Sequence, residues 1–140
     1  MSPDPRSPLL QAYRLQEDAA HVGFDWPDAQ GPLEKVKEEI AELDQEGRDG
    51  GWGMRDVLMD ELGDLLFAVV NLSRKLGVDP DRALQQANAK FSRRFEQVQR
   101  LAQDRGLELG RASLAELDML WDEVKRTEND GERRRRSEKG

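Results

Sequence analysis

The most apolar stretch of the chain, residues 59–72 (MDELGDLLFAVVNL), carries Glu61 and Asp64 among its apolar residues. Wound as an α-helix, this segment places Glu61, Asp64 and Asn71 on one stripe, and the rest of its surface is mostly Leu, Val and Phe. An unpaired charge in such surroundings is costly or is removed by protonation. The pattern therefore predicts a cation opposite the stripe, either a metal ion or the Lys and Arg side chains of another helix.

A second acidic pair, Glu39 and Glu42, has the same spacing within residues 35–43 (KVKEEIAEL). If the two helices pack antiparallel, four carboxylates converge, and a divalent cation is the simplest way to relieve their repulsion. Oxygen ligands favour hard ions, Mg²⁺ first and Mn²⁺ as the alternative. A di-iron bundle needs Glu-x-x-His pairs, and His21 is the only histidine. The competing interpretation of Glu39 and Glu42 is an ordinary solvated acidic face.

Basic residues with helical spacing follow later in the chain. Lys90 and Arg94 are four residues apart, as are Trp121 and Lys125. A Lys/Arg pair could hold the phosphate oxygens that a metal ion leaves free, and a tryptophan could stack on a base. The alternatives are surface salt bridges for the basic pair and core packing for Trp121.

The elements that must position these residues are all helical, because no segment alternates convincingly with a period of two. Asp79-Pro80 and the capping box of Ser113 and Glu116 mark helix starts, and Gly77 marks a stop. We expect an antiparallel bundle of about four to five helices, with residues 47–53 as a glycine-rich loop. The predicted helices span about 9–21, 32–46, 55–76, 80–105 and 114–126, with disordered segments at 1–8 and 127–140 and one helical domain over 9–126.

Composition limits the class of protein. The 140 residues carry a formal charge of −7, which argues against general polyanion binding, and they include no cysteine for a disulfide or a thiolate site. The basic run of Arg133 to Arg136 lies between Glu132 and Glu138, so we interpret it as a solvated tail rather than a nucleic-acid site. No segment is apolar enough to be a signal sequence or to cross a membrane, and we expect a cytoplasmic protein.

The helix predicted over 55–76 is apolar around most of its circumference, so it needs cover on several sides. The chain offers about four other helices, and two of them have only narrow apolar seams. We therefore expect a second copy of the chain to bury part of this surface, in a homodimer or a dimer of dimers.

These residues resemble the MazG nucleotide pyrophosphohydrolase family, within the all-α NTP pyrophosphatase superfamily. The resemblance rests on Glu38-Glu39-x-x-Glu42 followed by Glu61-x-x-Asp64. It extends over four blocks in order: GFDWPDAQGPLEKV (23–36), ELGDLLFAVVNL (61–72), ANAKFSRRF (87–95) and LWDEVKR (120–126).

The resemblance implies Mg²⁺-dependent hydrolysis of nucleoside triphosphates to the monophosphate and pyrophosphate, by helical dimers or larger assemblies. The residues that it assigns are the metal ligands and catalytic acids Glu39, Glu42, Glu61 and Asp64, the phosphate-binding Lys90, Arg94 and Lys125, and the nucleotide-proximal Trp121. We expect Asn71 near the nucleotide as well, and Glu38 in a structural role beside the ligands. Two other functions stay open: a dUTPase-like or modified-nucleotide house-cleaning enzyme of the same superfamily, and a non-catalytic helical dimerisation module.

Overall fold

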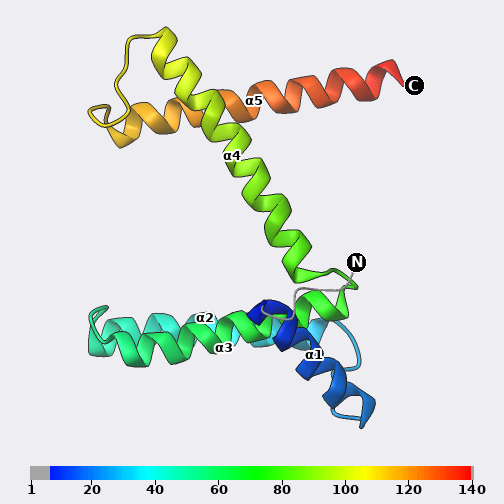
Figure 1. The fold of residues 1–140 in the computed structure, drawn as a ribbon. Coiled ribbons are helices and arrows are strands. Elements are labelled where there is room, and N and C mark those ends of the chain that lie inside the picture. Colours follow the sequence, from blue (N-terminus) through cyan, green and yellow to red (C-terminus); the bar gives the residue numbers. More distant parts are fainter. Residues whose placement is uncertain (1–6, 140) are drawn as a thin grey trace. The chain divides into compact units, whose positions relative to one another are not determined.

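Five α-helices, and no β-strand, make up residues 7–139, which the computed structural model describes (Figure 1). They are α1 (Pro8–His21), α2 (Gln30–Gly50), α3 (Arg55–Lys75), α4 (Pro80–Asp104) and α5 (Leu114–Glu138). The predicted all-α fold is confirmed. None of the described helices is long and apolar enough to cross a membrane.

Local signals in the sequence set several of the helix boundaries. Asp79 caps α4, where its Oδ1 accepts a hydrogen bond from the backbone N–H of Asp81 at 2.9 Å. Gly77 follows α3 with φ of 71°, a left-handed conformation that glycine adopts without steric cost. Ser113 and Glu116 form the predicted capping box of α5, with the Glu116 N–H donating to Ser113 Oγ at 3.1 Å.

The chain divides into two compact units that meet between Leu84 and Gln85, and we describe each by itself. The single domain predicted over residues 9–126 stays a prediction. In the first unit, α2 and α3 are joined by residues 51–54 and lie side by side as a hairpin (Figure 1). Helix α1 packs on α3, where Leu10, Ala68 and Val70 are buried.

The second unit has its own apolar core. Val98 and Ala102 of α4 pack with Leu120 and Val124 of α5, and all four are nearly inaccessible to solvent. The ring of Trp121 extends this core, because it packs against the buried cluster. The crossing of α4 and α5 is thus stabilised by burial of apolar surface.

The predicted glycine-rich loop is shorter than expected, because α2 continues through Gly47 to Gly50. Gly47 is buried under the side chain of Trp52, and a Cβ atom at this position would lie 2.3 Å from the Trp52 ring. Gly47 therefore lets the tryptophan fold back onto the helix. Sequence alone assigned both residues to the loop, since glycine is usually a poor helix former.

The predicted disorder of 127–140 is wrong for most of that segment, because α5 runs on to Glu138. Glu and Arg are good helix formers, and no proline interrupts the segment. Glu128 also ties the extension to α4 by accepting a hydrogen bond from Arg94 Nε at 2.8 Å. At the other end, residues 1–6 lie outside the described part of the chain, whereas Ser7 caps α1 and Pro8 is its first residue.

We expect Ser113→Ala to destabilise the second unit by about 1 kcal/mol, because the first turn of α5 loses the acceptor for the Glu116 N–H. Chemical denaturation followed by circular dichroism measures this change. Ser92→Ala is the matched control, since Ser92 is exposed within α4 and alanine is the better helix former there. Equal stability of the two variants would contradict the role of the cap.

Candidate metal centre

The α2–α3 hairpin brings acids from both helices together, as the two i, i+3 pairs predict. Glu39 of α2 and Glu61 and Asp64 of α3 each offer a carboxylate oxygen, and these oxygens lie within 4.8 Å of one another. Glu39 is only 5% exposed, Glu61 is half-buried and Asp64 is exposed. Three like charges therefore share one space that is closed on the Glu39 side and open on the Asp64 side.

Glu42 and Glu38 lie beside this cluster rather than in it. The pKa of Glu42 is raised above its ordinary value, first by the negative charge of Glu39, then by desolvation, with a further contribution from Glu61. Glu42 is exposed, so it stands at the solvent side of the acids. Glu38 is exposed as well, and it pairs with Lys35 at 3.4 Å.

The electrostatics of the cluster favour a bound cation. The pKa of Glu61 is raised, first by burial and then by the charges of Asp64 and Glu39. Lys35 is the one ion-pair partner of Glu39 among the described residues, at 3.1 Å from its Oε1. The second oxygens, Glu39 Oε2 and Glu61 Oε2, are buried and have no hydrogen-bond partner within residues 7–139. Buried polar atoms rarely stay unpaired, so this donor set fits a hard metal ion.

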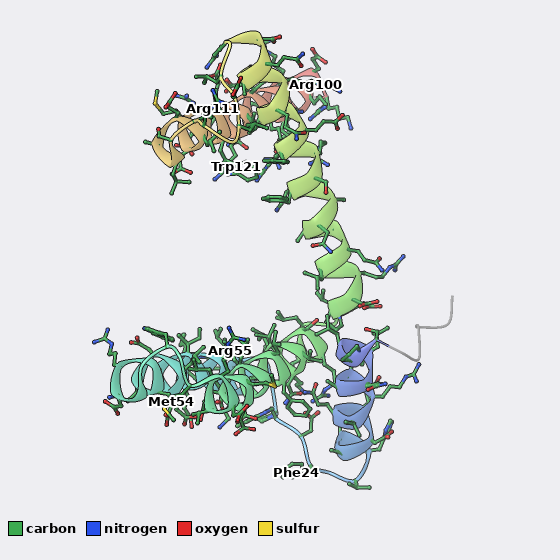
Figure 2. The ribbon with its side chains drawn as sticks, turned by 60° about the vertical axis from the view of Figure 1, so that its left-hand side comes forward. Phe24, Met54, Arg55, Arg100, Arg111 and Trp121 are labelled. Carbon is green, nitrogen blue, oxygen red and sulfur yellow. The ribbon has the colours of Figure 1, made fainter. Side chains whose placement is uncertain are left out.

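A cavity of about 660 Å³ adjoins the acids. This volume lies within the range of about 300–1,000 Å³ that small-molecule sites occupy. Its walls come from α1, the loop after α1, α2 and α3, and Phe24 lies on that loop (Figure 2). The lining combines aromatic and aliphatic side chains with a few polar ones: Leu15, Gln16, Ala19, Gly23, Phe24, Asp25, Trp26, Lys35, Glu39, Asp64, Phe67, Ala68, Asn71 and Arg74.

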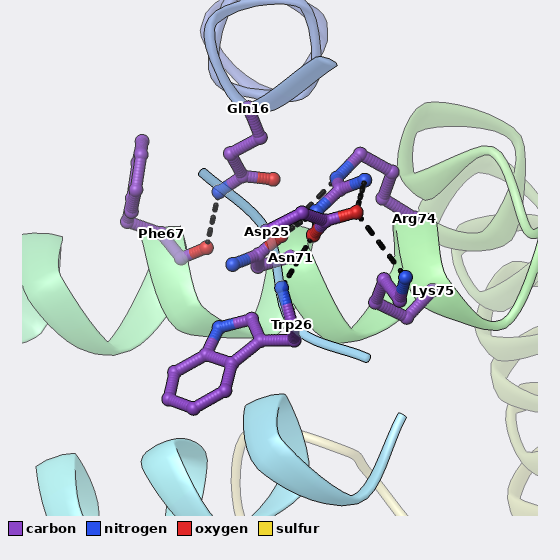
Figure 3. Close-up of polar contacts among 7 residues, drawn as sticks. All are labelled: Gln16, Asp25, Trp26, Phe67, Asn71, Arg74 and Lys75. Carbon is purple, nitrogen blue, oxygen red and sulfur yellow. Dashed lines mark hydrogen bonds and ion pairs between the residues drawn. The ribbon is translucent and has the colours of Figure 1, made fainter. Parts of the chain in front are cut away.

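An ion pair fastens the loop to the end of α3. The Asp25 carboxylate accepts hydrogen bonds from Arg74 and, at 3.2 Å, from Lys75 (Figure 3). The guanidinium of Arg74 lowers the pKa of Asp25 far below its usual range. The neighbouring Trp26 stands against α2, where a Cβ atom on Gly31 would lie 2.3 Å from its ring. Asp25 and Arg74 are 49 residues apart, and no local sequence pattern links them.

The predicted phosphate-binding residues belong to the second unit. Lys90 and Lys125 are exposed there. Arg94 is paired with Glu128, and its guanidinium carbon lies 6.0 Å from the centre of the Trp121 ring. Trp121 is half-buried and contacts the core, as the packing interpretation expected. The roles of these residues toward phosphate stay predictions.

The fold and the acid cluster together describe an all-α protein with a candidate metal centre next to a cavity of small-molecule size. The sequence profile of the MazG nucleotide pyrophosphohydrolase domain matches residues 30–99, half of the chain. The chain therefore belongs to the MazG family. The match includes all four acids, Lys90 and Arg94.

Two individual relatives match the chain over more residues than the family profile does. The chain is 44% identical over 122 residues to the nucleoside triphosphate pyrophosphohydrolase of Escherichia coli, which covers 87% of the chain and 46% of the relative. It is 45% identical over 117 residues to the nucleoside triphosphate pyrophosphohydrolase/pyrophosphatase MazG of Thermotoga maritima. This match covers 84% of the chain and 44% of the relative. A match of 45% over 71 residues to the Bacillus subtilis protein YabN covers 51% of the chain and 14% of that protein. The chain thus spans less than half the length of these relatives.

We expect Glu61→Gln to raise the melting temperature of the metal-free protein by a few degrees, because it removes a charge that burial and its neighbours oppose. The same substitution should abolish any rise in melting temperature on adding Mg²⁺, since a ligand oxygen loses its charge. Differential scanning fluorimetry with and without Mg²⁺ measures both effects. Glu38→Gln is the matched control, because Glu38 is exposed and outside the cluster. A destabilised metal-free Glu61→Gln protein would contradict the predicted repulsion.

The stability difference between Glu61→Gln and the unaltered protein should depend on pH. A carboxyl group whose pKa is raised by folding stabilises the fold fully below its ordinary value of 4.5, and this contribution is lost as pH rises through the folded pKa. The advantage of the glutamine variant should therefore be largest at neutral pH and shrink on acidification. Melting temperatures of both metal-free proteins, measured from neutral pH down to the ordinary carboxyl pKa of 4.5, test this dependence. A difference that stays constant with pH would contradict the prediction.

Proposed function

We propose that the chain is a Mg²⁺-dependent nucleoside triphosphate pyrophosphohydrolase, which produces a nucleoside monophosphate and pyrophosphate. The observation that carries this proposal is the continuity of the acid cluster with the cavity, since Glu39 and Asp64 belong to both. A metal-bound phosphate at the acids and a nucleoside in the apolar part would use the two regions at once. Membership of the MazG family and the names of the two longer relatives support the same reaction.

The charges around the cavity favour this orientation of the substrate. Lys35 is paired with Glu38 and Glu39, and Arg74 is paired with Asp25. Neither cation is free to bind phosphate within the cavity, so phosphates belong at the acid cluster, where a metal ion mediates between like charges. The aromatic side chains of Phe24, Trp26 and Phe67 are suited to a nucleoside instead.

Glu39, Glu61 and Asp64 would hold the ion, with Glu42 at the solvent side. A divalent ion bound there lowers the pKa of water and offsets negative charge on phosphate oxygens. We assign the proton from the attacking water to Glu42, which is exposed and lies beside Glu39. The water oxygen then bonds to the α-phosphorus, and the bridging oxygen leaves with pyrophosphate.

The proposal also keeps the residues that the family resemblance assigns to the substrate. Lys90, Arg94 and Lys125 are the residues that the family resemblance assigns to phosphate, and Trp121 is the one that it assigns to the nucleotide. We retain these roles as part of the proposal. The dUTPase-like and house-cleaning alternatives share this chemistry and differ in the nucleotide that they hydrolyse.

Release of pyrophosphate tests the function. With Mg²⁺, we expect each productive triphosphate to yield pyrophosphate and the monophosphate, measured by coupled pyrophosphate detection and chromatography. Asp64→Asn should lower turnover by about 100-fold or more, whereas Glu38→Gln should retain it. Orthophosphate without pyrophosphate would exclude attack at the α-phosphorus, and a panel with dUTP and oxidised nucleotides separates the alternatives. A folded protein without hydrolysis of any member would favour the dimerisation module.

We also propose that a second copy of the chain covers α3. Its side chains Met59, Leu62, Leu66 and Val69 are exposed, a large apolar surface for one helix of a monomer. Light scattering should therefore give at least twice the chain mass, and Leu66→Asp should reduce it by placing a charge in the interface. The exposed Leu114 offers a matched control, Leu114→Asp, which should leave the mass unchanged. A monomeric unaltered protein would contradict the proposal.

A further inference from the structure

Arg94 and Glu128 form the most shielded ion pair among the described residues of the second unit. Arg94 Nε donates to Glu128 Oε2 at 2.8 Å, and the two side chains are only 19% and 20% exposed. In each other ion pair of that unit, at least one side chain is about half exposed or more. A shielded pair contributes little net stability, because desolvation offsets most of the attraction between its charges. The geometry that this pair imposes is therefore the better explanation for it.

The Glu128 carboxylate holds the guanidinium of Arg94 by one edge only. It accepts from Nε, and the described part of the chain offers no acceptor to the two terminal nitrogens. The guanidinium carbon lies over the ring of Trp121, 6.0 Å from the ring centre, and Trp121 belongs to α5 as Glu128 does (Figure 2). A carboxylate and an aromatic ring thus fix the group from two sides. The edge that remains carries parallel N–H donors, which suit the oxygens of an anion.

Two further cations stand one helical turn from this pair. Lys90 precedes Arg94 by four residues on α4, and Lys125 precedes Glu128 by three residues on α5. Both lysines are exposed, and neither has an ion-pair partner within residues 7–139. Glu128 therefore restrains one cation and leaves the two lysines available, an arrangement that favours an anionic group at this surface.

We propose that Glu128 is a positioning residue, which holds Arg94 with its terminal nitrogens ready for a phosphate of the substrate. The inference rests on the proposed function for the assignment of Arg94 to phosphate. An unrestrained arginine has to give up rotational freedom when it binds phosphate, whereas the ion pair has already restricted Arg94. The helical extension that carries Glu128 then serves the binding of substrate as well as the packing of α5.

Glu128→Met and Glu128→Gln together test this role. Both remove the charge at similar volume, but glutamine keeps an oxygen that can accept from Arg94 Nε, whereas methionine does not. With Mg²⁺ and the triphosphate that is hydrolysed best, we expect Glu128→Met to raise KM about tenfold with kcat nearly unchanged, because the phosphates are charged both before and during the reaction. Glu128→Gln should keep KM within about threefold of the unaltered value. Glu128→Ala also lacks the acceptor and should match Glu128→Met.

Glu123→Met is the matched control. Glu123 also joins α5 to the end of α4, where it accepts a hydrogen bond from Arg105 at 2.7 Å. A purely structural loss reduces the amount of folded enzyme, so it lowers the apparent kcat and the melting temperature but leaves KM unchanged. In an Arg94→Ala background, Glu128→Met should raise KM no further, because there is no guanidinium left to position.

The same KM in Glu128→Met and Glu128→Gln would overturn the positioning role, and so would a rise in Glu123→Met as large as that in Glu128→Met. A lower KM in both Glu128 variants would overturn it too, because the carboxylate would then oppose the phosphate. If no triphosphate is hydrolysed, the proposed function fails separately, and calorimetric binding of inorganic tripolyphosphate with Mg²⁺ replaces KM. Weaker binding by Glu128→Met than by Glu128→Gln supports the positioning role, and equal or absent binding overturns it.

Discussion

The packing of α2 on α3 in the first unit has to accommodate the repulsion between carboxylates at their interface. Glu39 is buried against Glu61 and Asp64, and Lys35, its ion-pair partner, is shared with Glu38. One lysine cannot neutralise such a set, and burial raises the cost of each remaining charge. A hairpin that keeps these acids together is therefore stabilised by any divalent cation that they bind. Binding of the proposed metal ion would thus be coupled to folding through the same interface.

A second set of polar contacts defines the cavity beside the acids. Few residues are fully buried where α1 meets α3, so apolar contacts alone give a limited hold. Gln16 bonds to the backbone of α3, and the ion pair of Asp25 with Arg74 closes the loop over it. Exposed ion pairs add little stability, but this one is largely shielded and joins two aromatic-bearing segments. Its main effect is to keep the cavity walls in one arrangement.

Local patterns carried much of the information in the sequence. The i, i+3 spacing predicted that Glu61 and Asp64 would face Glu39, and capping signals located the starts of α4 and α5. These features depend on a few neighbouring residues. The contacts of Gln16 with Phe67 and of Asp25 with Arg74 join residues about 50 positions apart, and no local rule identifies them. The sequence prediction ended α5 near Arg126 because the residues that follow are not apolar and cannot be buried. An exposed helix needs only residues of favourable helix propensity, so α5 continues to Glu138.

Helix α3 is apolar around most of its surface and yet carries acids and an amide along one stripe. Glu61 and Asp64 face α2, and Asn71 lies two turns further along the same stripe, at the cavity. Ala68, between them, is buried, and its small side chain leaves the cavity open beside it. The exposed side chains Met59 and Leu66 belong neither to the acid cluster nor to the cavity lining. From Leu62 to Leu72, Asp64 and Asn71 are the only polar side chains, and both lie on that stripe. The exposed apolar side chains of α3 are the surface that the proposed second copy would cover, so the same helix would couple assembly to the geometry of the acids.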